Sequence, residues 1–159
     1  MHWKVRREFL SRVEIFAKLD SGDLKAVAKS CGEATYADGE LLCRQGERGV
    51  AAFLVVSGKI RVENEMVDGE IVVITELGQG AMVGEMSIID GDERVASIRA
   101  VGEVMALVLT QWSMQGLLKQ RPTIAASMLP VVVRRFRQTT AELRKRDGDL
   151  EHARRSVND

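Results

Sequence analysis

Glycine spacing is the feature of this sequence that most constrains its fold. Eleven of the 14 glycines lie between residues 32 and 110, where they separate short runs rich in Val and Ile at intervals of about ten residues. Such spacing is typical of an all-β sandwich or barrel. Asp68-Gly69 adds a hairpin-turn signal between two of the runs. The predicted strands cover residues 33–36, 41–44, 52–57, 59–65, 70–77, 94–101 and 104–110.

The segment before this β unit, residues 1–31, is predicted to be helical. Apolar side chains recur at helical spacing between residues 9 and 17. A turn at residues 20–22 leads into a short helix, which Ser21 or Asp23 would cap. We therefore expect N-terminal helices that pack against the β unit.

The segment after the β unit, residues 111–150, is predicted to form two helices. The first covers residues 111–120, and Pro122 suits the first turn of a longer second helix. Positions about 3.5 residues apart in the second helix are mostly apolar, which is the pattern of a coiled-coil seam. These seam positions are Ala125, Leu129, Val132, Phe136, Thr139, Leu143, Arg146 and Leu150. The seam predicts a symmetric homodimer that pairs through this helix.

Two further signals bear on the shape of the long helix. Pro130 lies within it and removes a backbone donor, so a kink is expected there. Asp147-Gly148 predicts fraying or an end, which leaves residues 151–159 as a loose tail. The whole chain, residues 1–159, is short enough to form a single domain with one sizeable core.

Charge and hydropathy exclude several classes of protein. Lys+Arg and Asp+Glu both number 23, so the net charge is zero and gives no overall attraction to nucleic acid or to a membrane. No apolar run is long enough to span a bilayer, and the basic N-terminus lacks a signal-peptide pattern, so the expected location is the cytoplasm. A basic cluster on the long helix is interpreted as a solvated face: Arg134, Arg135, Arg137, Arg144, Lys145 and Arg146.

The residues needed for metal or nucleophilic chemistry do not gather in the β unit. The two histidines, His2 and His152, lie outside it, so neither a metal centre nor a Ser-His-Asp arrangement is expected. Cys31 and Cys43 are interpreted as free thiols that pack like small apolar residues. We therefore predict a protein that is not an enzyme, with no catalytic residue and no cofactor.

The stretch from Gly80 to Ser97 carries the one chemically informative motif. Gly80 and Gly84 bracket a bend at which the backbone can approach a ligand closely. Glu85 follows at once, and Arg94 comes nine residues later at the expected start of a strand. A guanidinium can bind a phosphate through two hydrogen bonds, and a nearby carboxylate can accept one from a ribose hydroxyl. This combination predicts a small nucleotide site.

This motif resembles the phosphate-binding cassette of cyclic-nucleotide-binding domains, which occur in bacterial catabolite activators, protein kinase A regulatory subunits and cyclic-nucleotide-gated channels. The family pattern is Gly-Glu-Leu-Ala-Leu, a spacer and Arg-Ala-Ala, and this chain has Gly84-Glu85-Met86-Ser87-Ile88 and then Arg94-Val95-Ala96. The resemblance extends from Phe9 to about Leu143. It implies an α+β fold: an eight-stranded β-roll (jelly roll) flanked by N-terminal helices and a long C-terminal helix.

The resemblance also implies roles for individual residues. Arg94 would bind the exocyclic oxygens of the cyclic phosphate, and Glu85 would accept a hydrogen bond from the ribose 2′-hydroxyl. Thr139 and Thr140 match a pair that contacts adenine, one from each subunit of a dimer. The full set of ligand-binding positions implied is Val62, Ile74, Val83, Gly84, Glu85, Met86, Ser87, Arg94, Val95, Ala96, Thr139 and Thr140. Within this set, Val62 and Ile74 would pack on the base, while the amides of Ser87 and Val95 would face the phosphate.

Two positions depart from the family pattern. Val83 stands where an aromatic residue usually precedes the Gly-Glu pair, which changes local packing. Val95 lacks the hydroxyl with which a threonine there reaches guanine in cGMP-selective members, so cAMP is the expected ligand and cGMP the alternative.

The predicted function is a regulatory module that binds a cyclic nucleotide and then changes the position of its C-terminal helix. The alternative is a degenerate β-roll that has lost ligand binding and acts as a dimerisation or interaction module. DNA binding by this chain is not expected, because about a dozen residues follow the long helix, too few for the helix-turn-helix domain of catabolite activators. Whether the chain is whole or an excised domain stays open.

Overall fold

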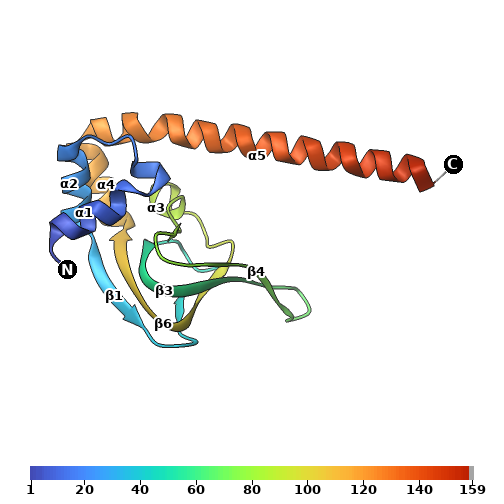
Figure 1. Ribbon diagram of the computed structural model, residues 1–159, viewed down its shortest axis with the longest axis horizontal. Helices are drawn as coiled ribbons and strands as arrows, with labels where there is room; N and C mark the ends of the chain where they lie inside the picture. The colour runs from blue at the N-terminus through green and yellow to red at the C-terminus, as the bar shows by residue number, and fades with distance from the viewer. Residues whose placement is uncertain (158–159) are drawn as a thin grey trace.

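The computed structural model describes the backbone of residues 1–157 and the side chains as far as residue 150. Helices cover one side of a β-roll, and a long C-terminal helix runs across them and projects past the roll (Figure 1). In chain order the elements are α1 (Trp3–Ser11), the 3-10 helix η1 (Glu14–Phe16), α2 (Ser21–Ser30), β1 (Gly32–Tyr36), β2 (Leu41–Cys43), β3 (Ala51–Glu65), β4 (Ile71–Leu77), β5 (Met82–Val83), α3 (Ser87–Asp90), β6 (Ser97–Thr110), α4 (Gln111–Gln120) and α5 (Pro122–Val157).

The sheet is antiparallel and confirms the predicted β unit. Its main path runs β1-β6-β3-β4, while β2 pairs with β6 and β5 pairs with β3. The structure joins strands that the sequence separates: β3 runs unbroken through Gly58, and β6 through Gly102. Both glycines have positive φ and lie where these strands bend, so a glycine here marks a bend within a strand rather than its end. Counting each half of β3 and β6 separately turns the six strands into the eight of the predicted roll.

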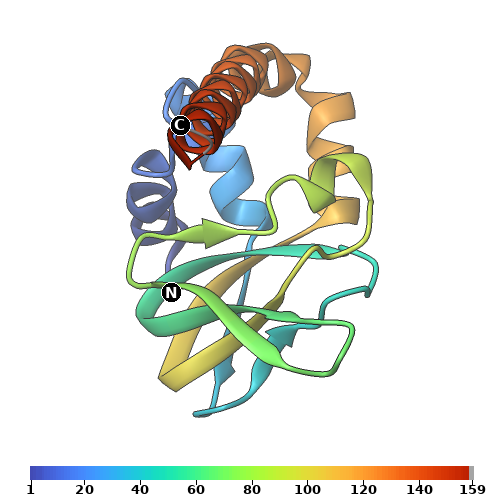
Figure 2. The same cartoon turned by 90° about the vertical axis from the view of Figure 1, so that its right-hand side faces the viewer.

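Two apolar cores lie on opposite faces of β3 because successive side chains of a strand point to opposite sides. Leu54 faces the helices, where it belongs to a cluster with Phe16 and Met114. Val55 faces the interior of the roll, in a cluster with Val104. The helices thus close one face of the roll, as the second view also shows (Figure 2).

The long helix differs from its predicted limits. It begins with Pro122, as expected, and it continues through Pro130 and past Asp147-Gly148 as far as Val157. The helix therefore does not end at Gly148. A glycine inside a helix costs about 1 kcal/mol relative to alanine, and that cost does not interrupt the helix here. Residues 158 and 159 of the predicted tail lie outside the described residues. Within the described residues, no helix has both the length and the apolar character needed to cross a membrane.

Helix α2 is capped by Asp20 rather than by Ser21 or Asp23. The Asp20 carboxylate accepts a hydrogen bond of 2.8 Å from the backbone amide of Asp23, and the backbone of Asp20 is extended. This is the usual N-cap geometry, with the capping side chain bonding the third residue of the helix. The predicted turn at residues 20–22 is therefore the cap and first turn of the helix.

Asp23 instead joins α2 to the junction between α4 and α5. Its carboxylate is buried and accepts hydrogen bonds from the Thr123 hydroxyl and from the guanidinium of Arg121. The hydrogen bond from Thr123, followed by that from Arg121, outweighs the effect of burial and lowers the pKa of Asp23 below its ordinary value. The base of the long helix is thus fastened to the N-terminal helices by one buried carboxylate.

Asp23→Asn is expected to lower the free energy of unfolding by about 2 kcal/mol at pH 7, because it leaves a partner of a buried charged network unsatisfied. A carboxylate with a lowered pKa stabilises the fold above its ordinary pKa, and loses this effect as pH falls through the lowered value. Urea unfolding should therefore show the gap between wild type and variant shrinking as the pH drops below about 4. Glu8→Gln, in the exposed pair with Arg12, is the control. A gap that stays constant with pH would contradict the assignment.

The cysteines behave as expected from the sequence. Cys31 and Cys43 are both free thiols. Cys31 packs in the core beneath the helices, and burial raises the pKa of its thiol to about 12. It therefore stays a protonated, apolar packing residue at neutral pH.

Candidate nucleotide-binding site

The phosphate-binding cassette, residues 84–97, leaves the sheet at β5 and returns to it at β6. It contains one short helix, α3, which ends where Gly91 adopts a left-handed conformation and donates a hydrogen bond of 2.8 Å to the Ser87 carbonyl. Gly84 also has a positive φ of 79° and opens the cassette. Residues with a side chain rarely adopt this conformation, so both glycines serve the path of the chain.

The loop between β2 and β3, residues 44–50, fixes the backbone of the cassette. The Arg94 amide donates to the Glu47 carbonyl at 2.8 Å, and the Gly46 amide donates back to the Arg94 carbonyl at 2.9 Å. The Gly49 amide adds a bond of 3.0 Å to the Asp92 carbonyl. These three bonds hold the main chain at Arg94, so the start of its side chain is fixed.

The Arg94 side chain is a buried cation with unmet donors. It is 7% exposed, and its Nε atom has no hydrogen-bond partner. Within the described part of the chain, its side-chain hydrogen bond goes to the carbonyl oxygen of Ala51. The guanidinium also lies 5.7 Å from the centroid of the Phe53 ring. A buried charge is normally paired, so this side chain fits an anionic ligand.

Gly84 lies against this guanidinium. A Cβ atom at position 84 would come within 2.2 Å of Arg94 Nη1 and 3.0 Å of the Ala51 carbonyl oxygen. The absence of a side chain therefore gives the guanidinium the space in which it lies. The structure thus brings Gly84 and Arg94, ten residues apart in the sequence, into direct contact.

Glu85 contacts the long helix. It is 17% exposed, and its Oε1 atom accepts a hydrogen bond of 2.6 Å from Nη1 of Arg135 on α5. Partial burial disfavours the charge of Arg135, but the hydrogen bonds to Glu85 and Glu14 outweigh it and raise the pKa of Arg135. The Oε2 atom of Glu85 is the oxygen that remains for a further donor, such as a ribose hydroxyl.

Arg135 is the site residue that the sequence analysis missed. It belongs to the basic cluster that the sequence predicts to face solvent, whereas the structure places it between the cassette and the N-terminal segment. One signal was available: Arg135 precedes Thr139 by one helical turn, so the two share a face of the helix.

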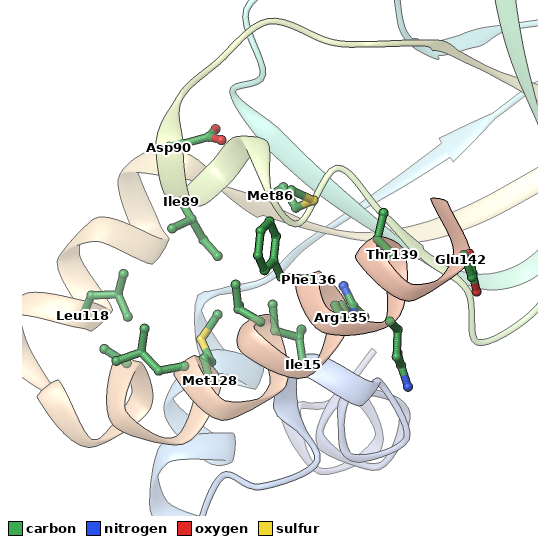
Figure 3. Close-up of a pocket in the computed structure, with 14 residues that line it drawn as sticks. Ile15, Met86, Ile89, Asp90, Leu118, Met128, Arg135, Phe136, Thr139 and Glu142 are labelled. Carbon is green, nitrogen blue, oxygen red and sulfur yellow. The ribbon is translucent and has the colours of Figure 1, made fainter. Parts of the chain in front are cut away.

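Thr139 lies in a groove of about 690 Å³ between the cassette helix α3 and α5. Met86 and Ile89 line it from the cassette, and Phe136 lines it from α5 (Figure 3). Thr140 differs from its neighbour, because its hydroxyl donates to the Phe136 carbonyl at 2.9 Å within the helix. The structure thus brings Thr139 and Met86 to one groove and turns the Thr140 hydroxyl to the backbone.

Val62 and Ile74 lie apart from that groove, on the β3–β4 hairpin. Val62 is half-buried and pairs with Thr75, and the next residue of β3 pairs with Val73. Ile74 is therefore the extra residue of a β-bulge, and its side chain is exposed. Bulges redirect side chains, so a base-packing role for Ile74 stays a prediction.

The remaining predicted residues occupy the cassette and its entry. Val95 and Met86 are exposed, while Ser87 and Ala96 are half-buried. Val83 is half-buried in β5, where it pairs with Phe53 of β3. Val83 thereby takes its place beside the ring that Arg94 also contacts.

Comparison with known proteins agrees with this geometry. A model of the cyclic nucleotide-binding domain matches residues 33–121. The CRP-like cAMP-activated global transcriptional regulator of Mycobacterium tuberculosis is 29% identical over 86% of this chain and 61% of its own length. The cyclic AMP receptor protein of Thermus thermophilus is 34% identical over 68% of this chain and 50% of its own. The chain thus spans half to three fifths of the length of these relatives.

Solved structures show the same fold. The N-terminal domain of a transcriptional regulator from Streptomyces coelicolor A3(2) aligns with a TM-score of 0.76 and 32% identity, over 82% of this chain and 94% of that one. The catabolite activator protein of Thermus thermophilus aligns with a TM-score of 0.72 and 29% identity, over 84% of this chain and 63% of that one. With the cassette in place around Arg94, these likenesses show that the chain belongs to the cyclic nucleotide-binding domain family.

Proposed function

We propose that this chain binds cAMP reversibly as a regulatory signal and carries out no chemistry on it. The observation that carries the proposal is the buried Arg94 guanidinium, whose Nη1 lies beside Gly84 and whose Nε has no hydrogen-bond partner among the described residues. A cyclic phosphate supplies the negative charge and the acceptors that this cation lacks. The names of two relatives, a cAMP-activated regulator and a cyclic AMP receptor protein, support cAMP as the ligand.

The proposed mechanism is a shift in the population of two positions of α5. The phosphate binds Arg94 and draws the cassette around it, while the ribose 2′-hydroxyl donates to Glu85. Glu85 already contacts α5 through Arg135, so a change at the sugar reaches the long helix over two side chains. Thr139 then lies near the exocyclic amine of adenine.

Calorimetric titration of the full chain with cAMP and cGMP tests this proposal. We expect one site per chain and tighter binding of cAMP, because Val95 has no hydroxyl for the guanine amino group. Titrations at two temperatures are needed, because the enthalpy of binding can be zero at one temperature. A heat capacity change that is not zero then makes the binding heat measurable at the other temperature. Folded protein that gives no heat with either nucleotide at both temperatures would refute ligand binding and favour the degenerate module.

We further propose that α5 pairs with the same helix of a second chain. Its seam is apolar and exposed, and Phe136 is 72% exposed at its centre. Exposed apolar stripes of this kind usually mark an interface. The seam residues Ala125, Leu129, Val132, Phe136 and Thr139 also line the groove beside the cassette. A partner helix on this seam would therefore touch the nucleotide site. The expected contact of Thr139 and Thr140 with adenine, one from each subunit, requires such a partner helix.

Phe136→Glu is expected to weaken the dimer by more than about 30-fold, because each of the two chains loses a phenyl ring worth about 2 kcal/mol of burial and gains a charge. Sedimentation equilibrium over a range of protein concentrations measures the change. Ala141→Glu is the matched control: it adds the same charge on an exposed position outside the seam. A dimer that survives Phe136→Glu, or that Ala141→Glu disrupts equally, would exclude pairing through this seam.

A further inference from the structure

Arg135 is held by two carboxylates from distant parts of the chain. Its Nη1 donates to Glu85 of the cassette at 2.6 Å, and its Nε donates to Oε2 of Glu14 at 3.2 Å. The other oxygen of Glu14 accepts from Arg134 at 3.3 Å. One N-terminal carboxylate therefore holds two neighbouring arginines of α5, and one of these holds Glu85 (Figure 3 shows Arg135 on the groove side of α5).

The planar guanidinium makes these two contacts interdependent. Its donors lie in a rigid fork, so fixing the Nε edge against Glu14 also fixes the direction in which Nη1 points. That direction sets which oxygen of Glu85 is occupied, and leaves the other oxygen for the ligand. The position of Glu85 in the site thus depends on a residue that does not touch the site.

We propose that Glu14 is a positioning residue of the cyclic-nucleotide site, acting through Arg135 to orient Glu85 and to couple the N-terminal 3-10 turn to ligand binding. This inference rests on the proposed function, because it assigns Glu85 to the ligand. It adds to that function a third element, η1, which joins the cassette and α5 in one ionic chain.

The setting of Glu14 separates it from an ordinary surface ion pair. Glu14 is 46% exposed, but the next two residues of η1, Ile15 and Phe16, are buried in the core beneath the helices. Its main chain is therefore anchored, so the pair has to order the Glu14 side chain but not the backbone that carries it. The Glu8–Arg12 pair on α1 has both partners largely exposed within one helix, and such pairs contribute little.

The test is a double-mutant cycle read out by cAMP affinity in the full chain. We expect Glu14→Gln to weaken cAMP binding about fivefold, and Glu8→Gln to leave it within about twofold. In an Arg135→Gln background the effect of Glu14→Gln should disappear, because its route to Glu85 has been removed. The wild-type and Glu14→Gln affinities should also converge in about 0.5 M salt, since the Glu14 contact is partly exposed and screened.

The outcomes separate this inference from the proposed function. If the wild type binds no cyclic nucleotide, both are overturned. If the wild type binds cAMP and Glu14→Gln binds equally well, the inference alone fails. It also fails if Glu14→Gln keeps its full effect in the Arg135→Gln background, because Glu14 would then act by a route that does not pass through Arg135.

Discussion

Replacing Arg94 with Gln is expected to weaken cAMP binding by about 100- to 1000-fold and to leave the fold as stable as before. The binding loss follows from removing the buried cation beside Gly84, since truncating one side of a desolvated charge pair costs about 3–4 kcal/mol. The unchanged stability is expected because of the surroundings of Arg94 in the unliganded protein. There the guanidinium is buried, and among the described residues its Nε has no partner and no carboxylate contacts it, so its charge does not stabilise the fold.

Calorimetry and urea unfolding together measure this prediction. Arg94→Lys should fall between wild type and Arg94→Gln, because it keeps the charge and loses the two-pronged hydrogen bonding. Arg61→Gln is the control, since Arg61 is a strand arginine that pairs with Glu76 at the surface of β3 and β4. Affinity of Arg94→Gln within threefold of wild type would remove Arg94 from the site. A large loss of stability in this variant would mean that the cation serves the fold instead.

Much of the fold could be predicted because its signals are local. The bounds of α4, residues 111–120, agree with the structure, since Thr110 and the break before Pro122 are signals within the segment itself. The positions of Gly58 and Gly102 indicate where the chain changes direction, but they do not indicate whether the strand ends there. A glycine with positive φ fits a turn between two strands and a bend inside one strand equally well. Only the pairing of β3 with β6 on both sides of the bend decides between these possibilities.

The candidate site also contains residues that local sequence signals identify and one residue, Arg135, that they do not. Gly84, Glu85 and Arg94 lie within one short motif, so the sequence identifies them together, and the structure places Gly84 against the Arg94 guanidinium. Arg135 could not be found from its neighbourhood, because its role arises when α5 folds back over the cassette and the N-terminal turn. A run of arginines on a long helix usually faces solvent, and Arg137 does so here. The contacts that distinguish Arg135 join residues far apart in the sequence.

Gly84→Ala is expected to weaken cAMP binding about 50-fold, although it adds one methyl group and removes no polar atom. The added Cβ would lie 2.2 Å from Arg94 Nη1 and 3.0 Å from the Ala51 carbonyl, so the guanidinium must leave the position from which it would bind the phosphate. Titration of the variant with cAMP measures the loss. Combined with Arg94→Gln, Gly84→Ala should cause little further loss of affinity, because both changes act on the same guanidinium.

Gly80→Ala separates the steric effect from the conformational one. Gly80 has a φ of 86°, close to the 79° of Gly84, but among the described residues no atom beyond its chain neighbours lies within 4 Å of a Cβ placed there. Each alanine costs about 1 kcal/mol for the left-handed conformation, so both variants should lose similar stability on that account. Only Gly84→Ala displaces Arg94, so Gly80→Ala should keep its affinity within about threefold of wild type. Equal losses of affinity would trace the effect to strain in the loop, and would contradict the view that Gly84 is a glycine because the phosphate-binding cation needs its space.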